Sequence, residues 1–261
     1  MKRIASLIAI GCALVCAAEP VKLAPSTPKE FTDGAKLETT DGALLVRTTG
    51  SFISKQHVAV DKTKPGRLTL EYKLAPGAKP DPFVVSLDVL DAKGIRIVGA
   101  HIFPIKTTET ELAADAKKGD KTLKIKDASQ WQDIPLKRGT MVAFNVKEDL
   151  SDLPNRTVSG LIESVSPEGE VTLRVPLRVG YPAGTRVRVH RDIGSFGIGS
   201  TYRRAGEEWQ KLTIEIKPDS KDEAYRWWSF AEKVGPRFGF VRGKINEDAG
   251  LLIRNIEFTQ E

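Results

Sequence analysis

The stretch Arg67-Leu68-Thr69-Leu70-Glu71-Tyr72-Lys73-Leu74 alternates between polar and apolar residues along its whole length. Successive side chains of a β-strand point to opposite faces, so Leu68, Leu70, Tyr72 and Leu74 would share one face. The charged residues and Thr69 would share the other face. This pattern is typical of an antiparallel strand with one buried and one solvated face. We therefore predict an all-β fold.

Similar strand patterns lie on both sides of this stretch. Residues 83–90 follow a turn-rich segment, and Asp91-Ala92-Lys93-Gly94 predicts a hairpin turn into residues 95–103. Residues 209–217 alternate as residues 67–74 do. Residues 250–258 carry apolar side chains on both parities, which indicates either a bulge or a strand covered on both faces.

A second β unit interrupts this pattern. Short strand-like runs separated by Gly, Pro, Asn and Asp occupy residues 107–191, and Ser166-Pro167-Glu168-Gly169 predicts a tight turn between two of them. We expect residues 31–106 and 192–261 to form one antiparallel β-sandwich, with 107–191 inserted as a small β-barrel-like domain. An insertion of this kind is tolerated where its two ends lie close together.

A short helix is predicted near the C-terminus, over residues 221–234. Ser220 stands three residues before Glu223, which is the spacing of a capping box. The apolar residues that follow recur at helical intervals: Ala224, Trp227, Trp228, Ala231 and Val234. Gly235-Pro236 would end this helix.

The N-terminal residues have the pattern of an export signal. Lys2 and Arg3 precede an apolar run over residues 4–15, and Cys16-Ala17-Ala18 supplies the small residues of a cleavage site. The run is too short for a membrane helix, and no later stretch approaches about 18 uncharged apolar residues. We expect a signal peptide at residues 1–18 and a mature protein that is secreted or periplasmic.

Both cysteines, Cys12 and Cys16, lie within the predicted signal. The mature chain would then have no disulfide framework and no thiol chemistry. Either cysteine also resembles a loose lipoprotein signal, so the sequence leaves a lipid anchor open as an alternative. Residues 19–30 contain several prolines and no periodicity, and we expect them to be a linker between the signal and the fold.

The charge of the chain is mildly positive. Its 40 Lys and Arg and 34 Asp and Glu give a formal net charge of +6, which removal of Lys2 and Arg3 would lower to +4. The charges are scattered, whereas a nucleic-acid partner requires a clustered basic face. We expect no nucleic-acid partner, and the sequence leaves an acidic glycan or an anionic envelope surface open.

The sequence has no catalytic signature. His57, His101 and His190 are far apart and lack the paired spacing of zinc ligands. There is no Gly-x-Ser-x-Gly elbow. Paired carboxylates for glycoside hydrolysis depend on spacing in three dimensions, so an enzyme acting on polysaccharides stays open as a third alternative. We expect no catalytic residue, no cofactor and no metal.

Four segments carry a family resemblance: Gly50-Ser51-Phe52-Ile53-Ser54, the strand at 68–74, Glu208-Trp209-Gln210-Lys211-Leu212-Thr213-Ile214, and Gly250-Leu251-Leu252-Ile253-Arg254-Asn255-Ile256-Glu257-Phe258. Together they resemble a jelly-roll carbohydrate-binding module of the galactose-binding-like or CenC-like type. The resemblance implies a jelly-roll sandwich and a glycan ligand. In calcium-carrying members an acidic residue commonly precedes the Asn-Ile pair, and Arg254 at that position puts a calcium site in doubt here.

The inserted unit resembles small β modules of phage tail proteins and surface-associated hydrolases. The likeness rests on Gly119-Asp120-Lys121-Thr122-Leu123-Lys124-Ile125 and Pro182-Ala183-Gly184-Thr185. It implies no chemistry.

The aromatic residues are the main candidates for a ligand site, because sugars stack their apolar faces on Trp and Tyr. We expect Trp131 and Trp209 to be core residues. The predicted helix places Trp227 and Trp228 on its apolar stripe, and Tyr225 and Arg226 on the exposed flank of that stripe. The candidate ligand-binding residues are therefore Tyr225, Arg226, Trp227 and Trp228.

These patterns favour an exported, non-catalytic protein that binds a polysaccharide or an envelope glycan. A structural or protein-interaction scaffold of the envelope, with a protein partner, is the alternative. A polysaccharide-active enzyme is the third hypothesis. Fold alone does not decide between these functions.

Overall fold

The computed structural model describes residues 20–136, 139–193, 196–240 and 246–260. The predicted signal peptide and both cysteines lie outside these residues. The described chain is built of antiparallel β-strands, which confirms the all-β sandwich class. Its helical segments are short 3-10 turns: η1 (Pro28–Glu30), η2 (Gly34–Lys36), η3 (Gly99–His101), η4 (Ser129–Trp131) and η6 (Glu223–Tyr225).

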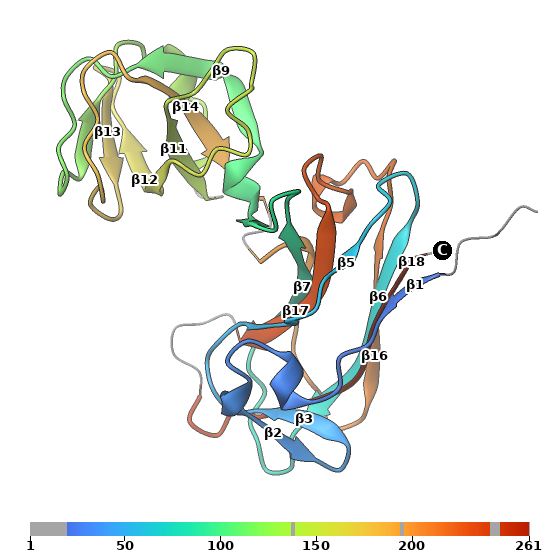
Figure 1. The fold of residues 1–261 in the computed structure, drawn as a ribbon. Coiled ribbons are helices and arrows are strands. Elements are labelled where there is room, and N and C mark those ends of the chain that lie inside the picture. The colour runs from blue at the N-terminus through green and yellow to red at the C-terminus, as the bar shows by residue number, and fades with distance from the viewer. Residues whose placement is uncertain (1–19, 137–138, 194–195, 241–245, 261) are drawn as a thin grey trace, which may run out of the picture.

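The described strands before and after the insertion form two antiparallel sheets that pack face to face (Figure 1). The first, here called the β6 sheet, has the order β16 (Gln210–Ile216), β6 (Gly66–Leu74), β18 (Leu251–Gln260), β3 (Ala43–Val46) and β2 (Leu37–Thr40), with β1 (Val21–Leu23) also paired to β18. The second, the β7 sheet, has the order β15 (Ile198–Arg203), β7 (Phe83–Leu90), β17 (Lys233–Phe240) and β4 (Phe52–Ile53), with β5 (Val58–Ala59) on β17 and β8 (Arg96–Ile97) on β7.

The alternation of β6 decides which of its faces is buried. Leu68 and Leu70 are almost fully buried and lie opposite Ile214 and Leu212 of β16, on the face that meets the β7 sheet. Burial of each such leucine contributes about 1.5–3 kcal/mol. The polar residues of the strand, including Glu71, face outward, as the sequence predicts. The outer face of this sheet is therefore available to a ligand.

The inserted residues form a third sheet with a core of its own. The strand order is β10 (Thr122–Lys124), β13 (Glu170–Leu173), β12 (Val158–Val165), β11 (Thr140–Phe144), β14 (Arg186–Arg191) and β9 (Pro104–Glu111). An antiparallel bridge between Leu112 and Ile125 joins the two ends of this order, so the sheet closes into a barrel. Trp131 is buried at the centre of the barrel core, where its indole N–H donates to the Thr108 carbonyl at 2.8 Å.

The chain enters and leaves the barrel at adjacent points. The backbone N–H of Arg191 donates to the Phe103 carbonyl at 2.9 Å. Further contacts hold the barrel to the sandwich, among them an ion pair of 2.5 Å between Arg156 and Asp91. An insertion with adjacent ends constrains the host sandwich little.

The predicted helix over residues 221–234 is wrong. A 3-10 turn at Glu223–Tyr225 is all that forms, and Arg226 is already extended, with φ −108° and ψ 148°. Residues 233–240 instead form β17, which pairs with β7 along its whole length. Only residues 233 and 234 of the predicted helix belong to this strand. Before it, Trp227, Trp228 and Ala231 are buried in the sandwich core, and helical periodicity is a weak influence against such tertiary context.

The expected linker at residues 19–30 also differs from the structure. Val21, Lys22 and Leu23 form β1, which pairs with the end of β18. Leu23 is buried in the sandwich core. Three residues carry too little pattern to predict a strand, and its partner lies more than 230 residues away in the chain.

Histidine 190 is buried between the barrel and the sandwich. Its Nε2 accepts from the Arg188 Nε at 3.2 Å, so its Nδ1–H can donate to the Ala100 carbonyl at 2.8 Å. Burial lowers the pKa of His190 from its ordinary value to about 4. The native protein therefore holds this imidazole neutral under conditions in which an unfolded chain would bind a proton.

We predict that removal of the barrel leaves a folded sandwich. A short Gly/Ser link would replace residues 104–191 and join Phe103 to Asp192, whose neighbour Arg191 already contacts Phe103. Because the sandwich core contains no residue of the removed segment, the shortened chain should unfold in a single cooperative transition. Thermal unfolding followed by circular dichroism tests this, and loss of cooperativity would contradict the independence of the two cores.

We also predict that His190 makes the protein less stable in mild acid. Between pH 6.5 and 4 the unfolded chain binds a proton that native His190 does not, so the free energy of unfolding falls as the pH falls. The contribution of His190 is about 3 kcal/mol at most. In His190→Asn the side-chain amide can still donate to Ala100 but does not titrate. Urea unfolding from pH 7 to 4 should give a flatter profile for this variant, and identical profiles would refute the assignment.

Candidate functional site

Strand β18 has two different neighbours on one of its sides, one along its first residues and another along its last residues. Its first residues pair with β3 and its last residues pair with β1, so residues 254–257 have no strand partner on that side among the described residues. On the other side its register with β6 shifts between Arg254 and Glu257. Asn255 lies in this bulge with a φ of 51°. The sequence left a bulge or a strand covered on both faces as alternatives for residues 250–258. The structure has the bulge, and it also buries Leu251 and Leu252 in separate clusters.

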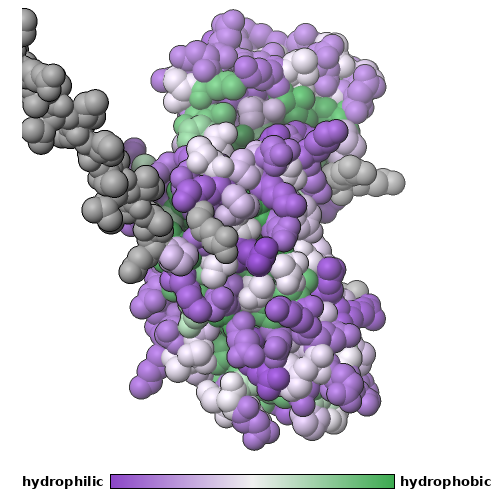
Figure 2. Space-filling model, turned by 90° about the vertical axis from the view of Figure 1, so that its right-hand side faces the viewer, coloured by the Kyte–Doolittle hydropathy of each residue, from purple (hydrophilic) through white to green (hydrophobic). Residues whose placement is uncertain are grey.

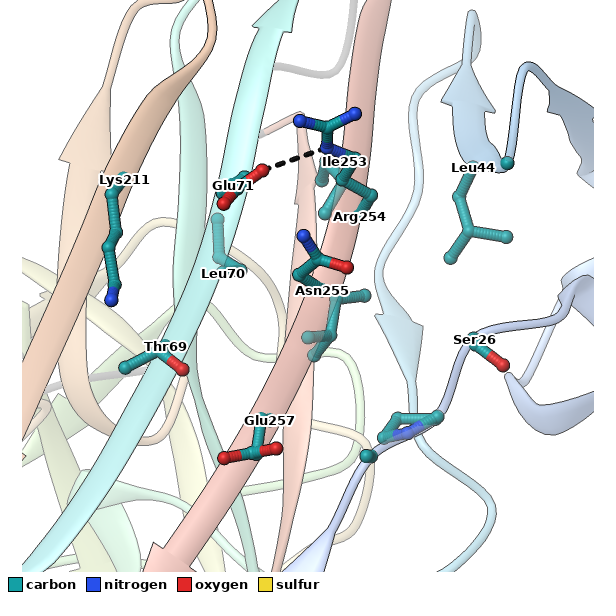
Figure 3. Close-up of a pocket in the computed structure, with 14 residues that line it drawn as sticks. Ser26, Leu44, Thr69, Leu70, Glu71, Lys211, Ile253, Arg254, Asn255 and Glu257 are labelled. Carbon is teal, nitrogen blue, oxygen red and sulfur yellow. Dashed lines mark hydrogen bonds and ion pairs between the residues drawn. The ribbon is translucent and has the colours of Figure 1, made fainter.

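A groove of about 410 Å³ opens at this seam on the β6 sheet. We call it the seam groove. Figure 3 shows polar side chains from β6, β16 and β18, together with Ser26, around it. The polar residues that line it are Ser26, Thr69, Glu71, Lys211, Arg254, Asn255 and Glu257.

The charged groups of the seam groove are partly paired. Arg254 donates from its Nε to a Glu71 carboxylate oxygen at 2.8 Å. Glu257 forms an ion pair of 2.5 Å with Lys22. By contrast, the Lys211 ammonium and the Asn255 amide have no hydrogen-bond or ion-pair partner among the described residues. These two groups are free to bind a ligand.

The hydroxyl groups of the seam groove are also unpaired. The side chains of Thr69 and Ser26 have no hydrogen-bond partner in the part of the chain that the structure describes. Each hydroxyl can donate one hydrogen bond and accept others. The seam groove therefore offers hydroxyl, amide and ammonium groups in one place.

Trp209 lies at the rim of this region, on the outer face of the β6 sheet. The Arg254 guanidinium carbon is 3.9 Å from the centroid of its ring, and the Lys73 Nζ is 5.0 Å from it. The ring packs on a small outer cluster of Ala43, Leu45, Ala75 and Leu252 rather than in the main core that the sequence predicts. The parity of residues 209–217 already places Trp209 with the outward side chains. The stacked guanidinium is held between this ring and Glu71.

The four candidate residues from the sequence lie elsewhere. Trp227 and Trp228 are 6% and 2% exposed and belong to the sandwich core, so neither offers a stacking face. Tyr225 is partly buried, with its hydroxyl 3.0 Å from the Thr201 hydroxyl. Arg226 lies 3.7 Å from Glu223. None of the four lines the seam groove.

Each of the two tryptophans is buried by a contact of its own with the sandwich core. Trp227 packs edge-to-face on Phe258 and donates from its Nε1 to the Lys64 carbonyl at 2.7 Å. Trp228 packs edge-to-face on Phe103, at the entrance to the barrel. Trp227 and Trp228 therefore cover one end of the sandwich, and we call this pair the end cap.

The described residues show no arrangement for metal chemistry. In this part of the chain, no group of three or more His, Cys, Asp and Glu side chains is placed to hold a metal ion. His57 contacts Asp88 at 3.2 Å, and His190 contacts Arg188 and Ala100. None of the helices within the described ranges has the length and apolar character to cross a membrane.

Comparison with known proteins gave no match to a family model, a curated protein or a solved structure.

We predict that the end cap does not tolerate a side chain at Gly66. A Cβ there would lie 2.7 Å from the Trp227 Cζ2 and 3.0 Å from the Phe258 Cε2. Gly66→Ala should lower the free energy of unfolding by about 1–3 kcal/mol. Gly206→Ala is the control, because its nearest neighbour would be the Gln210 Nε2 at 3.7 Å. Urea unfolding measures both variants, and equal stability would argue against the tight packing of this cap.

Proposed function

We propose that this protein is a non-catalytic glycan-binding protein and that the seam groove is its ligand site. The observation that carries the proposal is the convergence of unpartnered polar groups at one opening in the β6 sheet. Ser26, Thr69, Lys211 and Asn255 supply hydroxyl, ammonium and amide groups. A sugar presents closely spaced hydroxyls, each of which donates and accepts hydrogen bonds, and these groups match that chemistry.

Two further features support a glycan as the ligand. The sandwich architecture is the one that the resemblance to jelly-roll carbohydrate-binding modules implies. The face in Figure 2, seen from the right-hand side of Figure 1, is dominated by hydrophilic residues over its lower part, where the sandwich lies. A polymer of sugars would meet few large apolar patches on such a surface. The N-terminal pattern adds a secreted or periplasmic location to the proposal, with lipidation as the alternative.

The contacts within the seam groove favour binding over hydrolysis. Glycoside hydrolysis uses a pair of carboxyl groups, one as acid and one as base or nucleophile. Both carboxylates of the groove, Glu71 and Glu257, are engaged by Arg254 and Lys22. We therefore place the polysaccharide-active enzyme after the binding protein.

A protein-interaction scaffold is the second candidate, and one feature of the barrel favours it. Val175 and Val179 are each 52% exposed and lie near each other in the chain. They border a second groove of about 330 Å³ that Met141 and Tyr181 also line. A partner protein would cover these side chains.

Affinity electrophoresis through gels that contain different polysaccharides tests the proposal. Thr69 and Thr213 lie opposite each other on β6 and β16, but Thr69 lines the seam groove and Thr213 does not. Thr69→Val should weaken retention about threefold to tenfold, because it removes one hydrogen bond of about 0.5–1.5 kcal/mol. Thr213→Val is the matched control and should leave retention unchanged.

A second variant, Asn255→Gly, removes the amide while keeping a residue that adopts a positive φ easily. It should weaken retention as Thr69→Val does. Equal effects of Thr69→Val and Thr213→Val would remove the seam groove from the proposal. Absence of retention on every polysaccharide would overturn glycan binding and leave the interaction scaffold.

A further inference from the structure

A second concavity lies on the edge of the sandwich, where β1, β5 and β17 approach one another. It has a volume of about 500 Å³, and we call it the edge pocket. Its charged and polar lining consists of Lys22 on β1, Lys55, Gln56 and His57 before β5, and Lys233 at the start of β17. β5 pairs with β17, with Ala59 opposite Lys233, which brings these distant residues together.

The edge pocket concentrates positive charge. Its lining, as far as the structure describes it, contains three lysines and no carboxylate. Lys55 and Lys233 are exposed and form no ion pair with any described residue. Other lysines of the sandwich are paired, as in Lys62–Glu232 and Lys79–Asp248, so the edge pocket differs from these positions in bringing two unpaired lysines together. Unpaired like charges in one pocket repel one another, and an anionic ligand would relieve that repulsion.

The floor of the edge pocket is rigid. The imidazole of His57 lies against Gly235, where a Cβ would come within 3.2 Å of its Nε2. This Nε2 is 3.2 Å from a carboxylate oxygen of Asp88, whose side chain is 3% exposed. The other Asp88 oxygen lies 2.6 Å from the Nε of Arg96. His57 is therefore held in place from below, and its Nδ1 has no partner among the described residues.

The edge pocket is connected to the seam groove by one ion pair. Lys22 lines the edge pocket, and its Nζ is 2.5 Å from Glu257, which lines the seam groove. Strand β1 thus lies between the two openings, with Lys22 in contact with both. A polymer that occupies the seam groove and crosses β1 would meet Lys55 and Lys233 next.

We infer that the edge pocket binds carboxylate groups of an acidic polysaccharide that extends from the seam groove across β1. This inference rests on the proposed glycan-binding function and names its ligand class, a uronic-acid polymer. Lysine ammonium groups bind carboxylates as charge-assisted hydrogen bonds, which are stronger than those between neutral groups. Hydroxyls of the same polymer would occupy the unpaired groups of the seam groove.

The test compares polygalacturonate with the same polymer after methyl esterification, which removes its charge. Affinity electrophoresis should retain the wild-type chain more strongly on the acidic form. Lys55→Gln/Lys233→Gln should weaken retention on the acidic form at least about threefold and leave retention on the ester unchanged. Lys118→Gln/Lys121→Gln is the matched control, because it makes the same charge change at exposed positions of the barrel.

The outcomes separate the two proposals. Equal weakening by both double variants would mean that net charge alone attracts the polymer, and it would overturn the edge pocket. The edge pocket would also be overturned if Lys55→Gln/Lys233→Gln were retained as strongly as the wild type. Weaker retention of Thr69→Val on both polymers in that case would still support the seam groove. Weaker retention of Lys55→Gln/Lys233→Gln on the acidic form, with an unchanged Thr69→Val, would support the edge pocket and overturn the seam groove. Thermal unfolding confirms that each variant is folded.

Discussion

The pairing of β18 is the constraint on which the rest of the sandwich depends. This strand lies at the centre of the β6 sheet and pairs with β6 on one side and with both β3 and β1 on the other. One strand can satisfy two partners on the same side if it bends between them, and a bulge with Asn255 at positive φ provides that bend. The seam groove is the opening that results.

The barrel and the end cap both contact the sandwich core at the point of insertion. The barrel leaves the sandwich at Phe103 and returns at Arg191, and these two residues are joined by a backbone hydrogen bond. Phe103 also packs against Trp228 of the end cap. The point of insertion is therefore covered by an indole ring, which closes the core where the chain departs from it.

The two openings on the sandwich differ in their chemistry. The seam groove combines paired charges with unpaired hydroxyl and amide groups, whereas the edge pocket carries unpaired lysines over a fixed imidazole. They share the Lys22–Glu257 ion pair. The acidic polysaccharide that we propose as ligand is both rich in hydroxyls and negatively charged, so it would complement both openings.

The sequence by itself determined several of the strands and the face that each of them buries. The alternation of β6, the exact span of β7 and the mixed parity of β18 were all readable, because the direction of a side chain on a strand is a local property. Only the tertiary structure decided which strands are neighbours. It buried Trp227 and Trp228 in the sandwich core, made a strand of residues 21–23, and gathered Lys22, Lys55 and Lys233 into one pocket. Pairing between distant segments is non-local, and no window of the sequence contains both partners.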